Sequence, residues 1–384
     1  MLVKQIYELT NDVVKETLGD SVVLQEDLSN LVDVGTAVFN ANAVDNYVRS
    51  LVNHIGKMVF VNRVYRGSAP SVLMDSWEFG SVCEKISGGL YEATENETWN
   101  LQDGETYNQD IFYKPKAIVK FYNSKTTFEI PMSFTERQLK ESFSNQTQLN
   151  SFLSMLMNDV EKTLTVKVDA LVMRTINNMI AETIYDDYGS NSLSASSGVK
   201  AINLLYLYNQ TFSQSLTVAK ALTDKDFIRF AVLQIMLYVG RIGKISTLFN
   251  IGKQPRFTPD DLLHLVMLDE FKASADVYLQ SETFHNEYTK LPNAEGVPFW
   301  QGSGTSYALA DTSKIKVKTS EGHEVEYSGI LCALWDRDAL GVSNPDRRVT
   351  THYNAKAEFY NNYYKHDASY FNDFNENMIV FFIA

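Results

Sequence analysis

The stretch that decides the fold is TQLNSFLSMLMNDVEKTLTVKVDALVMRTINNMIAET, from Thr147 to Thr183. Apolar residues recur in it at steps of three and four, and neither Pro nor Gly interrupts it. This pattern predicts one continuous amphipathic helix, about 55 Å long at a rise of 1.5 Å per residue. A compact domain of this size does not need so long a helix. We therefore interpret it as a support along which other parts of the chain lie, the alternatives being a coiled coil or an ordinary long core helix.

The residues that precede this helix show two different sequence patterns, one helical and one β. In residues 1 to about 60 the spacing of apolar residues predicts a polar, mostly helical arm. From Trp77 to Pro131 the sequence becomes β-like. A long acid-rich excursion from Glu92 to Asp110 separates a β segment at 77–86 from a second one at 116–132. This order predicts an extended hairpin that projects from the body. Its excursion has too few apolar residues to fold alone, so it must lie on something else.

The residues that follow the helix alternate between loop, mixed and β textures. A Ser-, Gly- and Asn-rich loop is predicted from Tyr185 to Gly198. The mixed region after it is expected to hold helices near 224–238 and 259–268, and strands near Val277 and at 315–317. From Tyr327 to Ala384 four β segments return. The prediction for the whole chain is therefore an α+β fold.

One of these late segments, EFYNNYYKHDASYFNDF from Glu358 to Phe374, is unusually aromatic. A strand that covers a single core alternates apolar and polar residues, because successive side chains point to opposite faces. Here Tyr363 and Tyr364 are neighbours, so large rings are expected on both faces of one strand. Either one face meets another molecule, or all the rings pack inside one chain.

Composition narrows the class of function. The chain has 34 basic and 47 acidic residues and a net charge of −13, which disfavours a protein that grips phosphate backbones. Its two cysteines, Cys83 and Cys332, exclude a disulfide framework. The N-terminal residues lack the apolar core of a signal peptide, and the run MIVFFIA near the C-terminus is too short to span a bilayer. We expect synthesis in the cytoplasm and no membrane contact.

No motif in the sequence predicts catalysis, a cofactor or a metal. The segment YVGRIGKIS lacks the first Gly and the Ser or Thr of a phosphate-binding loop. The six histidines form neither an H-x-H nor an H-E-x-x-H pair, and a structural metal site needs three or four convergent ligands. Asp260 and Asp261, directly after Pro259, are interpreted as charges at a helix N-terminus. We therefore expect a protein that is not an enzyme.

Two segments carry a resemblance to a known family. LWDRDALGVSNPDRRVTTHYNAKAEFYNNYYKHDASYFNDFNENMIVFFI, from Leu334 to Ile383, resembles the closing segment of tailed-bacteriophage major capsid proteins of the Hong Kong 97-type fold, especially those of small podoviruses. LHLVMLDEFKASADVYLQSETFHNEYTKLP, from Leu263 to Pro292, is similar to their central region. The order of arm, hairpin, long helix, mixed region and returning β segments agrees with this family over most of the chain.

The resemblance implies a division of the chain into the parts of such a capsid subunit. These are an N-terminal arm (1–53), the start of the peripheral domain (54–78), an extended loop (79–128), the peripheral domain with its spine helix (129–183), an axial domain (184–326) and the return of the peripheral domain (327–384). Some members of the family cross-link their subunits through a Lys and an Asn, but no motif assigns that chemistry to residues of this chain.

The function implied is that of a head protein that assembles with itself into pentamers and hexamers of a shell around double-stranded DNA. A scaffolding protein and a portal are expected partners, the DNA is contacted only weakly, and the protein is part of the virion. The aromatic side chains expected at subunit contacts are Trp99, Tyr107, Tyr360, Tyr363 and Tyr364. Two alternatives remain at this point: an encapsulin-like nanocompartment shell, and a carbohydrate-binding or glycoside-cleaving protein with exposed Tyr and Trp.

Overall fold

The protein was analysed as a computed structural model. It describes residues 11–16, 18, 34, 37, 71–74, 83–88, 93, 95, 102–106, 110–112, 114, 117–135, 146–280, 294–301, 308–357 and 359–384.

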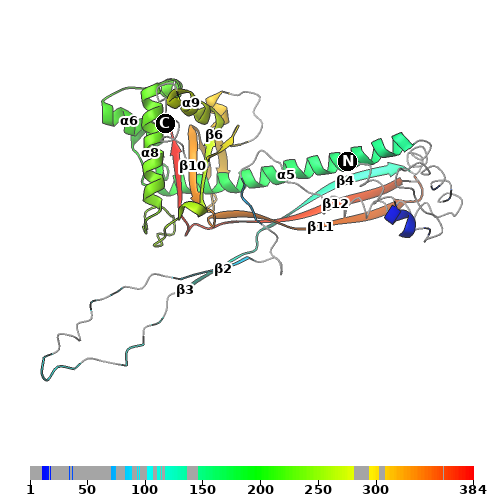
Figure 1. Ribbon diagram of the computed structural model, residues 1–384, viewed down its shortest axis with the longest axis horizontal. Coiled ribbons are helices and arrows are strands. Elements are labelled where there is room, and N and C mark those ends of the chain that lie inside the picture. Colours follow the sequence, from blue (N-terminus) through cyan, green and yellow to red (C-terminus); the bar gives the residue numbers. More distant parts are fainter. Residues whose placement is uncertain are drawn as a thin grey trace.

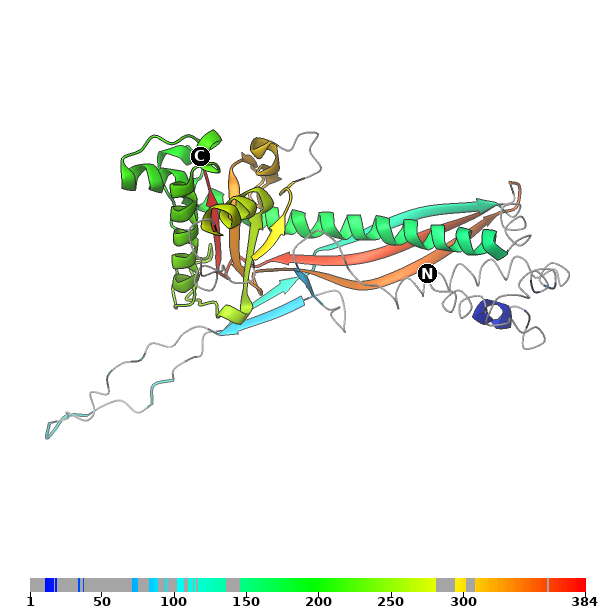
Figure 2. The same cartoon turned by 45° about the horizontal axis from the view of Figure 1, so that its top comes forward.

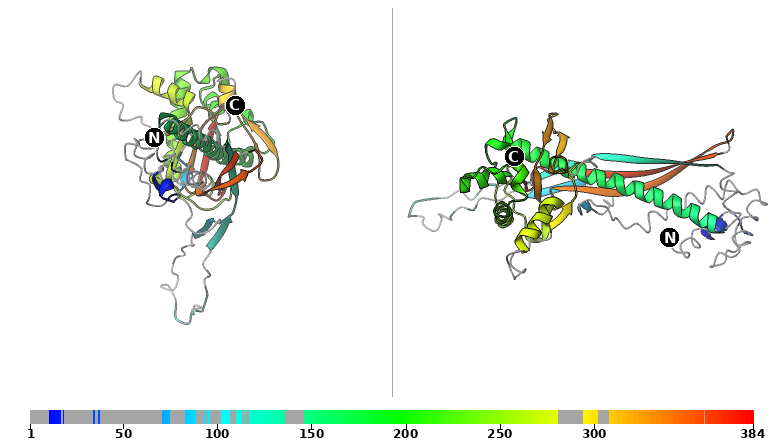
Figure 3. Two further views of the ribbon diagram at one scale, coloured as in Figure 1. Left: turned by 90° about the vertical axis from the view of Figure 1, so that its right-hand side faces the viewer. Right: turned by 90° about the horizontal axis from the view of Figure 1, so that it is seen from above.

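A long sheet and a long helix form the extended part of the molecule (Figure 1). The sheet, here called the long sheet, has the strand order β1-β11-β12-β4. Its strands are β1 (Leu73–Met74), β11 (Leu340–Asn354), β12 (Phe359–Asn372) and β4 (Lys125–Thr135). Strand β12 is antiparallel to both β11 and β4, whereas the short β1 is parallel to β11. Seen from above in Figure 3, helix α5 runs along these strands.

Helix α5 (Gln146–Tyr188) confirms the predicted long helix and extends it to 43 residues, about 65 Å. Its C-terminal end differs from the prediction, because a loop was expected from Tyr185 onward. Gly189 stops the helix with φ of 57° and donates its backbone N–H to the Tyr185 carbonyl oxygen at 2.7 Å, as glycine commonly does at a helix end. The buried residues of α5 recur at helical spacing, among them Val160, Leu164, Val168, Leu171 and Val172.

A second sheet, here called the core sheet, fills the compact part of the molecule. Its strand order is β5-β13-β10-β6-β7. The strands are β5 (Ala201–Asn203), β13 (Met378–Phe382), β10 (Ile330–Asp336), β6 (Leu263–Leu268) and β7 (Ala294–Val297). Every residue of β10 and β13 is buried, which is typical of strands that are covered on both faces.

Helices gather around the core sheet (Figure 2). They are α6 (Leu204–Phe212), α7 (Val218–Ala221), α8 (Lys225–Ile242), α9 (Asp269–Gln280) and α10 (Leu309–Thr312), with 3₁₀ turns at Leu193–Ala195 and Asp260–Leu262. The helix predicted near 224–238 is confirmed as α8. It begins there because the Asp224 side chain caps it, accepting the backbone N–H groups of Asp226 and Phe227 at 3.0 and 2.9 Å.

Two hairpins complete the fold. Strands β8 (Ile315–Lys318) and β9 (Glu324–Tyr327) pair beside α5, and β8 confirms the strand expected at 315–317. Strands β2 (Cys83–Gly88) and β3 (Ala117–Tyr122) form the base of a hairpin that projects from the body in Figure 1. The β segment predicted at 116–132 is divided: β3 pairs with β2, whereas β4 leaves the hairpin and joins the long sheet.

Two predictions for the mixed region were wrong. The segment 259–268 is a single 3₁₀ turn followed by strand β6, not a helix. A short apolar run has no period that separates a helix from a buried strand, and here β10 and β7 on either side supply the strand's hydrogen-bond partners. Val277 lies in helix α9, not in a strand. The four β segments predicted in the tail are confirmed as β10, β11, β12 and β13.

Candidate subunit interface

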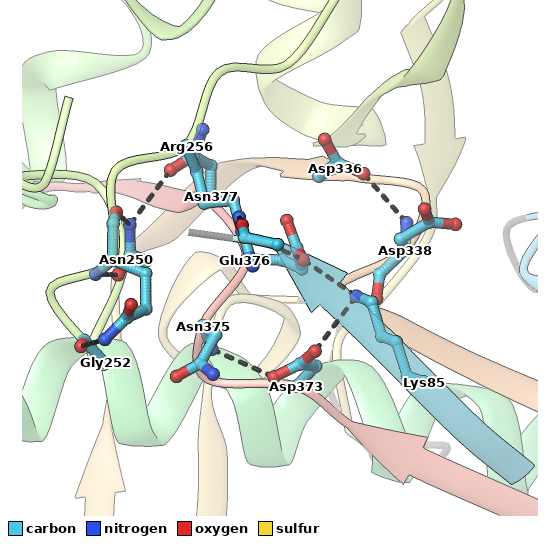
Figure 4. Close-up of polar contacts among 12 residues, drawn as sticks. Lys85, Asn250, Gly252, Arg256, Asp336, Asp338, Asp373, Asn375, Glu376 and Asn377 are labelled. Atoms are coloured by element: carbon cyan, nitrogen blue, oxygen red, sulfur yellow. Dashed lines mark hydrogen bonds and ion pairs between the residues drawn. The ribbon is translucent and has the colours of Figure 1, made fainter. Parts of the chain in front are cut away.

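The projecting hairpin is fixed to the body by a cluster of charged side chains, here called the hairpin anchor: Lys85, Lys120, Arg256, Asp373 and Glu376. Lys85, on β2, lies 2.9 Å from an oxygen of Asp373 and 2.9 Å from one of Glu376 (Figure 4). Lys120, on β3, lies 2.7 Å from the other oxygen of Asp373. Arg256 pairs with Glu376 at 3.3 Å. Both strands of the hairpin are therefore held by one buried acidic turn.

That acidic turn, residues 373–377, is itself held rigidly between β12 and β13. The Asp373 carboxylate accepts the backbone N–H of Asn375 at 3.0 Å, and the Asp373 N–H donates to the Ala339 carbonyl at 2.6 Å. Gly252 donates its N–H to the Phe374 carbonyl at 2.7 Å. A Cβ at position 252 would lie 2.0 Å from Asn375 Oδ1, so a larger residue there would displace the Asn375 side chain.

Burial and charge oppose each other in the hairpin anchor. Burial tends to lower the pKa of Lys85, but hydrogen bonds to Glu376 and Asp373 outweigh it, and the pKa is raised. Burial tends to raise the pKa of Asp373, but hydrogen bonds from Lys120 and Lys85 outweigh it, and the pKa is lowered. Only 3% of the Asp373 side chain is exposed. The anchor is thus charged on both sides, and each ion stabilises the other in a partly dehydrated setting.

Beyond its base, the hairpin offers its surface to solvent. All the described residues between β2 and β3 are exposed, namely 93, 95, 102–106, 110–112 and 114. They include Phe112, whose side chain is 85% exposed, and Ile111 at 48%. Exposed large apolar side chains on an attached arm are typical of a surface that meets another molecule. The sequence-based expectation that this excursion does not fold alone agrees with this exposure.

The aromatic strand β12 distributes its rings between two faces. Tyr360 and Tyr364 are 2% and 4% exposed. They lie on the same side of β12 as Tyr370, whose ring centre lies 4.9 Å from Cζ of Arg174 on α5. These two rings are therefore buried within the chain, on the face that α5 covers, and burial raises the pKa of Tyr364. Their part in a subunit contact stays a prediction.

Tyr363 lies on the opposite face of the long sheet, where it is half-buried. Its surroundings are polar: Lys365 pairs with Glu129 at 3.4 Å, and Thr127 donates to Asp367 at 2.6 Å. Arg348 also pairs with Asp367. An aromatic ring within such a paired polar surface is the arrangement that many interfaces use, with a ring as anchor and polar groups around it. Trp99 and Tyr107, the other two predicted contact residues, lie outside the described residues.

The described part of the chain offers no site for metal-dependent chemistry. No group of three or more His, Cys, Asp or Glu side chains there is arranged to hold an ion. His264, one of the six histidines, lies on strand β6 and stacks on Trp335 with ring centres 6.0 Å apart. None of the described helices has the length and apolarity that a membrane crossing requires.

Solved structures of phage capsids share the arrangement of elements described above. The capsid structure of Staphylococcus phage Andhra matches with a TM-score of 0.50 and 11% identity, over 84% of this chain and 86% of that one. The structure of head fiber and inner core protein gp22 of native bacteriophage P68 matches with a TM-score of 0.52 and 8% identity, also over 84% and 86%. At this identity the likeness concerns the fold alone. The expected α+β capsid fold of the Hong Kong 97 type is confirmed.

The sequence itself gives the family. The model of the Phi29-like phage major capsid protein family matches residues 10–382, so the chain belongs to this family and is a structural subunit of a phage head. No curated protein matches the chain. The findings point neither to a nanocompartment shell nor to a sugar-binding protein. Members of this family are parts of virions, and capsid subunits assemble with copies of themselves.

Sequence reasoning missed the hairpin anchor. Lys85 and Asp373 are far apart in the chain and carry no motif, so a single sequence does not connect them. The only signal was indirect: a polar hairpin that cannot fold alone needs an attachment, and β2 and β3 each carry a lysine at a central position. The charged partner could not be identified without the fold.

Proposed function

We propose that copies of this chain form the pentamers and hexamers of a closed shell around double-stranded DNA, and that the β2–β3 hairpin of each copy lies on its neighbour. The observation that carries the proposal is the contrast within the hairpin. Its base is fixed by buried ion pairs, whereas its described distal residues are exposed and include Phe112. A rigid attachment places the distal contacts at a defined distance from the body, which a shell with repeated geometry requires.

The division of labour expected from the sequence is part of this proposal. The parts at 1–53 and 79–128 act as an arm and an extended loop, 129–183 and 327–384 as the peripheral domain, and 184–326 as the axial domain around the capsomer centre. A scaffolding protein and a portal assist assembly in the cytoplasm of the host. The role is structural and includes no catalysis, and the DNA is confined by the wall and its counterions rather than gripped, given the net charge of −13.

The test is to remove the distal hairpin while keeping its base. Replacing residues 91–113 by a short Gly-Ser link leaves β2, β3 and the hairpin anchor in place. We expect a subunit with unchanged circular dichroism and melting temperature that no longer forms closed particles in negative-stain images. A length-matched variant with Gly and Ser throughout 91–113 should also fail to form closed particles, because it keeps the length of the hairpin but lacks the side chains that contact the neighbour. Normal shells from either variant would refute the proposal.

A further inference from the structure

A groove between α5 and the β8–β9 hairpin has the properties of a binding site. It has a volume of about 710 Å³. Its apolar wall is formed by Val166, Ala170 and Met173 of α5, with Phe299 and Val317 opposite. Val166 is 58% exposed. The groove thus presents an apolar surface to solvent along one side of the longest helix.

A buried amide that lines the groove needs a partner. The side chain of Asn177 is 3% exposed, and its Nδ2 donates to the Trp300 carbonyl oxygen at 2.6 Å. Its Oδ1 has no hydrogen-bond partner among the described residues. A buried acceptor without a donor is unfavourable and is rare in folded proteins. A ligand in this groove that offers an N–H or O–H group would satisfy it.

Two hydrogen bonds hold residues that line the groove. The Trp300 indole N–H donates to the Ile330 carbonyl at 2.9 Å, and Gln301 Nε2 donates to the Lys316 carbonyl at 3.0 Å. The groove is therefore preformed, which lowers the entropic cost of binding.

The charge at the rim selects the kind of ligand. Arg174, Lys316 and Lys318 line the groove together with a single acid, Asp169. The positive rim favours an anionic partner, but the apolar wall and the free acceptor of Asn177 do not suit nucleic-acid phosphates, which only accept hydrogen bonds. A peptide segment with apolar side chains, carboxylates and backbone N–H groups fits all three features.

The chain itself carries such a segment in the excursion of its β2–β3 hairpin. Residues 92–110 contain six acidic residues and no Lys or Arg, and Ile111 and Phe112 follow them directly. Phe112 has the highest exposed fraction of the exposed large apolar side chains in the described part of the chain. Figures 1 and 2 show strands β2 and β3 directed away from α5.

We infer that the groove between α5 and β8–β9 receives the hairpin segment around Ile111 and Phe112 from a second copy of the chain. This rests on the proposed function, in which the hairpin lies on a neighbour, and adds where it binds. Phe112 fills the apolar groove, a backbone N–H of the segment donates to Asn177 Oδ1, and the acidic residues meet the basic rim.

Engineered cysteines test this contact in assembled particles. After mild oxidation, shells of the double variant Phe112→Cys, Val166→Cys should give covalent dimers and larger oligomers on a non-reducing gel. The matched control is Phe112→Cys, Leu233→Cys. Leu233 on α8 has nearly the same exposed fraction as Val166, 54% against 58%, but lies outside the groove. We expect the yield of cross-linked species to be at least tenfold higher for the pair with Val166→Cys than for the control pair. The single-cysteine variants measure any cross-linking through the native Cys83 and Cys332. Equal yields would overturn the inference.

A binding experiment covers the case in which a double variant does not assemble. A synthetic peptide of residues 102–114 is titrated into dissociated subunits by fluorescence anisotropy. Val166→Asp should weaken binding at least tenfold, whereas Leu233→Asp should change it less than twofold. Absence of peptide binding would overturn the inference. Binding of short duplex DNA in place of the peptide, abolished in the double variant Lys316→Glu, Lys318→Glu, would overturn it as well.

The two proposals fail in different ways. If the variants of residues 91–113 lose their shells, but Val166→Asp assembles normally and Phe112→Cys does not link to Val166→Cys, the hairpin does lie on a neighbour and the groove is not its site. If the variants of 91–113 assemble normally, the proposed function itself falls.

Discussion

Tyr363 and Tyr364 are neighbours on β12 that face opposite sides of the long sheet, and this difference can be measured. Tyr364 is buried under α5, so Tyr364→Ala should lower the free energy of unfolding of the dissociated subunit by about 3–5 kcal/mol. Tyr363 is half-buried on the outer face. Tyr363→Ala should leave melting nearly unchanged but cost about 2 kcal/mol per contact in association, so that closed shells disappear.

The experiment compares thermal melting of subunits with particle yield for the two variants. Equal losses of subunit stability, or normal assembly of both variants, would mean that β12 does not divide its rings between its own core and a neighbour. All the rings would then act inside one chain.

The hydroxyl of Tyr364 gives a second prediction at the same position. Its Oη is buried and has no hydrogen-bond partner among the described residues. Tyr364→Phe removes this unsatisfied group while keeping the ring, and should be neutral or raise the free energy of unfolding by about 1 kcal/mol. The matched control is Tyr188→Phe. The Tyr188 hydroxyl accepts the Gly198 N–H at 2.8 Å and donates to the Ser196 carbonyl at 3.1 Å.

That control should lose about 0.5–1.5 kcal/mol in urea unfolding, because it removes the hydrogen bonds that the Tyr188 hydroxyl makes. A Tyr364→Phe variant as unstable as Tyr188→Phe would show that Tyr364 Oη is hydrogen-bonded in solution, for example to an ordered water.

At the scale of elements, the hairpin anchor sets a pH range for the attachment of β2–β3. The pKa of Asp373 is lowered, so its contribution to stability is present above the unfolded value of about 3.9 and is lost as pH falls through the folded value. The pKa of Lys85 is raised, so its contribution is present below about 10.4 and is lost as pH rises through the folded value. Attachment should therefore be constant between about pH 5 and 9.

A dye on Ile86→Cys reports the attachment, since Ile86 is 67% exposed at the base of the hairpin. Its fluorescence anisotropy should stay high across that range and fall below about pH 4. In Asp373→Asn it should be low at every pH, while the exposed Lys244→Met serves as a neutral control. A dye on Leu233→Cys separates local release from unfolding of the whole chain. A gradual fall of anisotropy between pH 5 and 9 would contradict the assignment of the charges.

At the scale of the whole molecule, net charge governs the relation to DNA. With a net charge of −13 per subunit, the average field repels phosphate. Dissociated subunits should bind duplex DNA no more tightly than the non-specific range of about 10⁻⁴ to 10⁻⁶ M at physiological salt. Fluorescence anisotropy with a labelled duplex measures this. A submicromolar dissociation constant would show a concentrated basic surface that the net charge conceals.

The sequence by itself determined the features that depend on local pattern. The spacing of apolar residues from Thr147 to Thr183 predicted α5, because residues three and four positions apart lie on the same face of a helix. The β textures of the tail predicted β10 to β13. The adjacency of Tyr363 and Tyr364 predicted rings on two faces, because alternation along a strand is a property of the backbone. These signals, with the resemblance they carried, were sufficient for the fold class and the family.

Only the tertiary structure decided what depends on partners distant in the chain. The run LHLVML became strand β6 because β10 and β7 lie beside it, and the single β segment at 116–132 divided because β2 and β12 each pair with one part of it. Lys85 and Asp373 form the hairpin anchor, and Asn177 lies in a groove with Val317, although nothing local connects them. Charge pairs, grooves and strand partners arise from close approach in space, and one sequence does not record which residues approach.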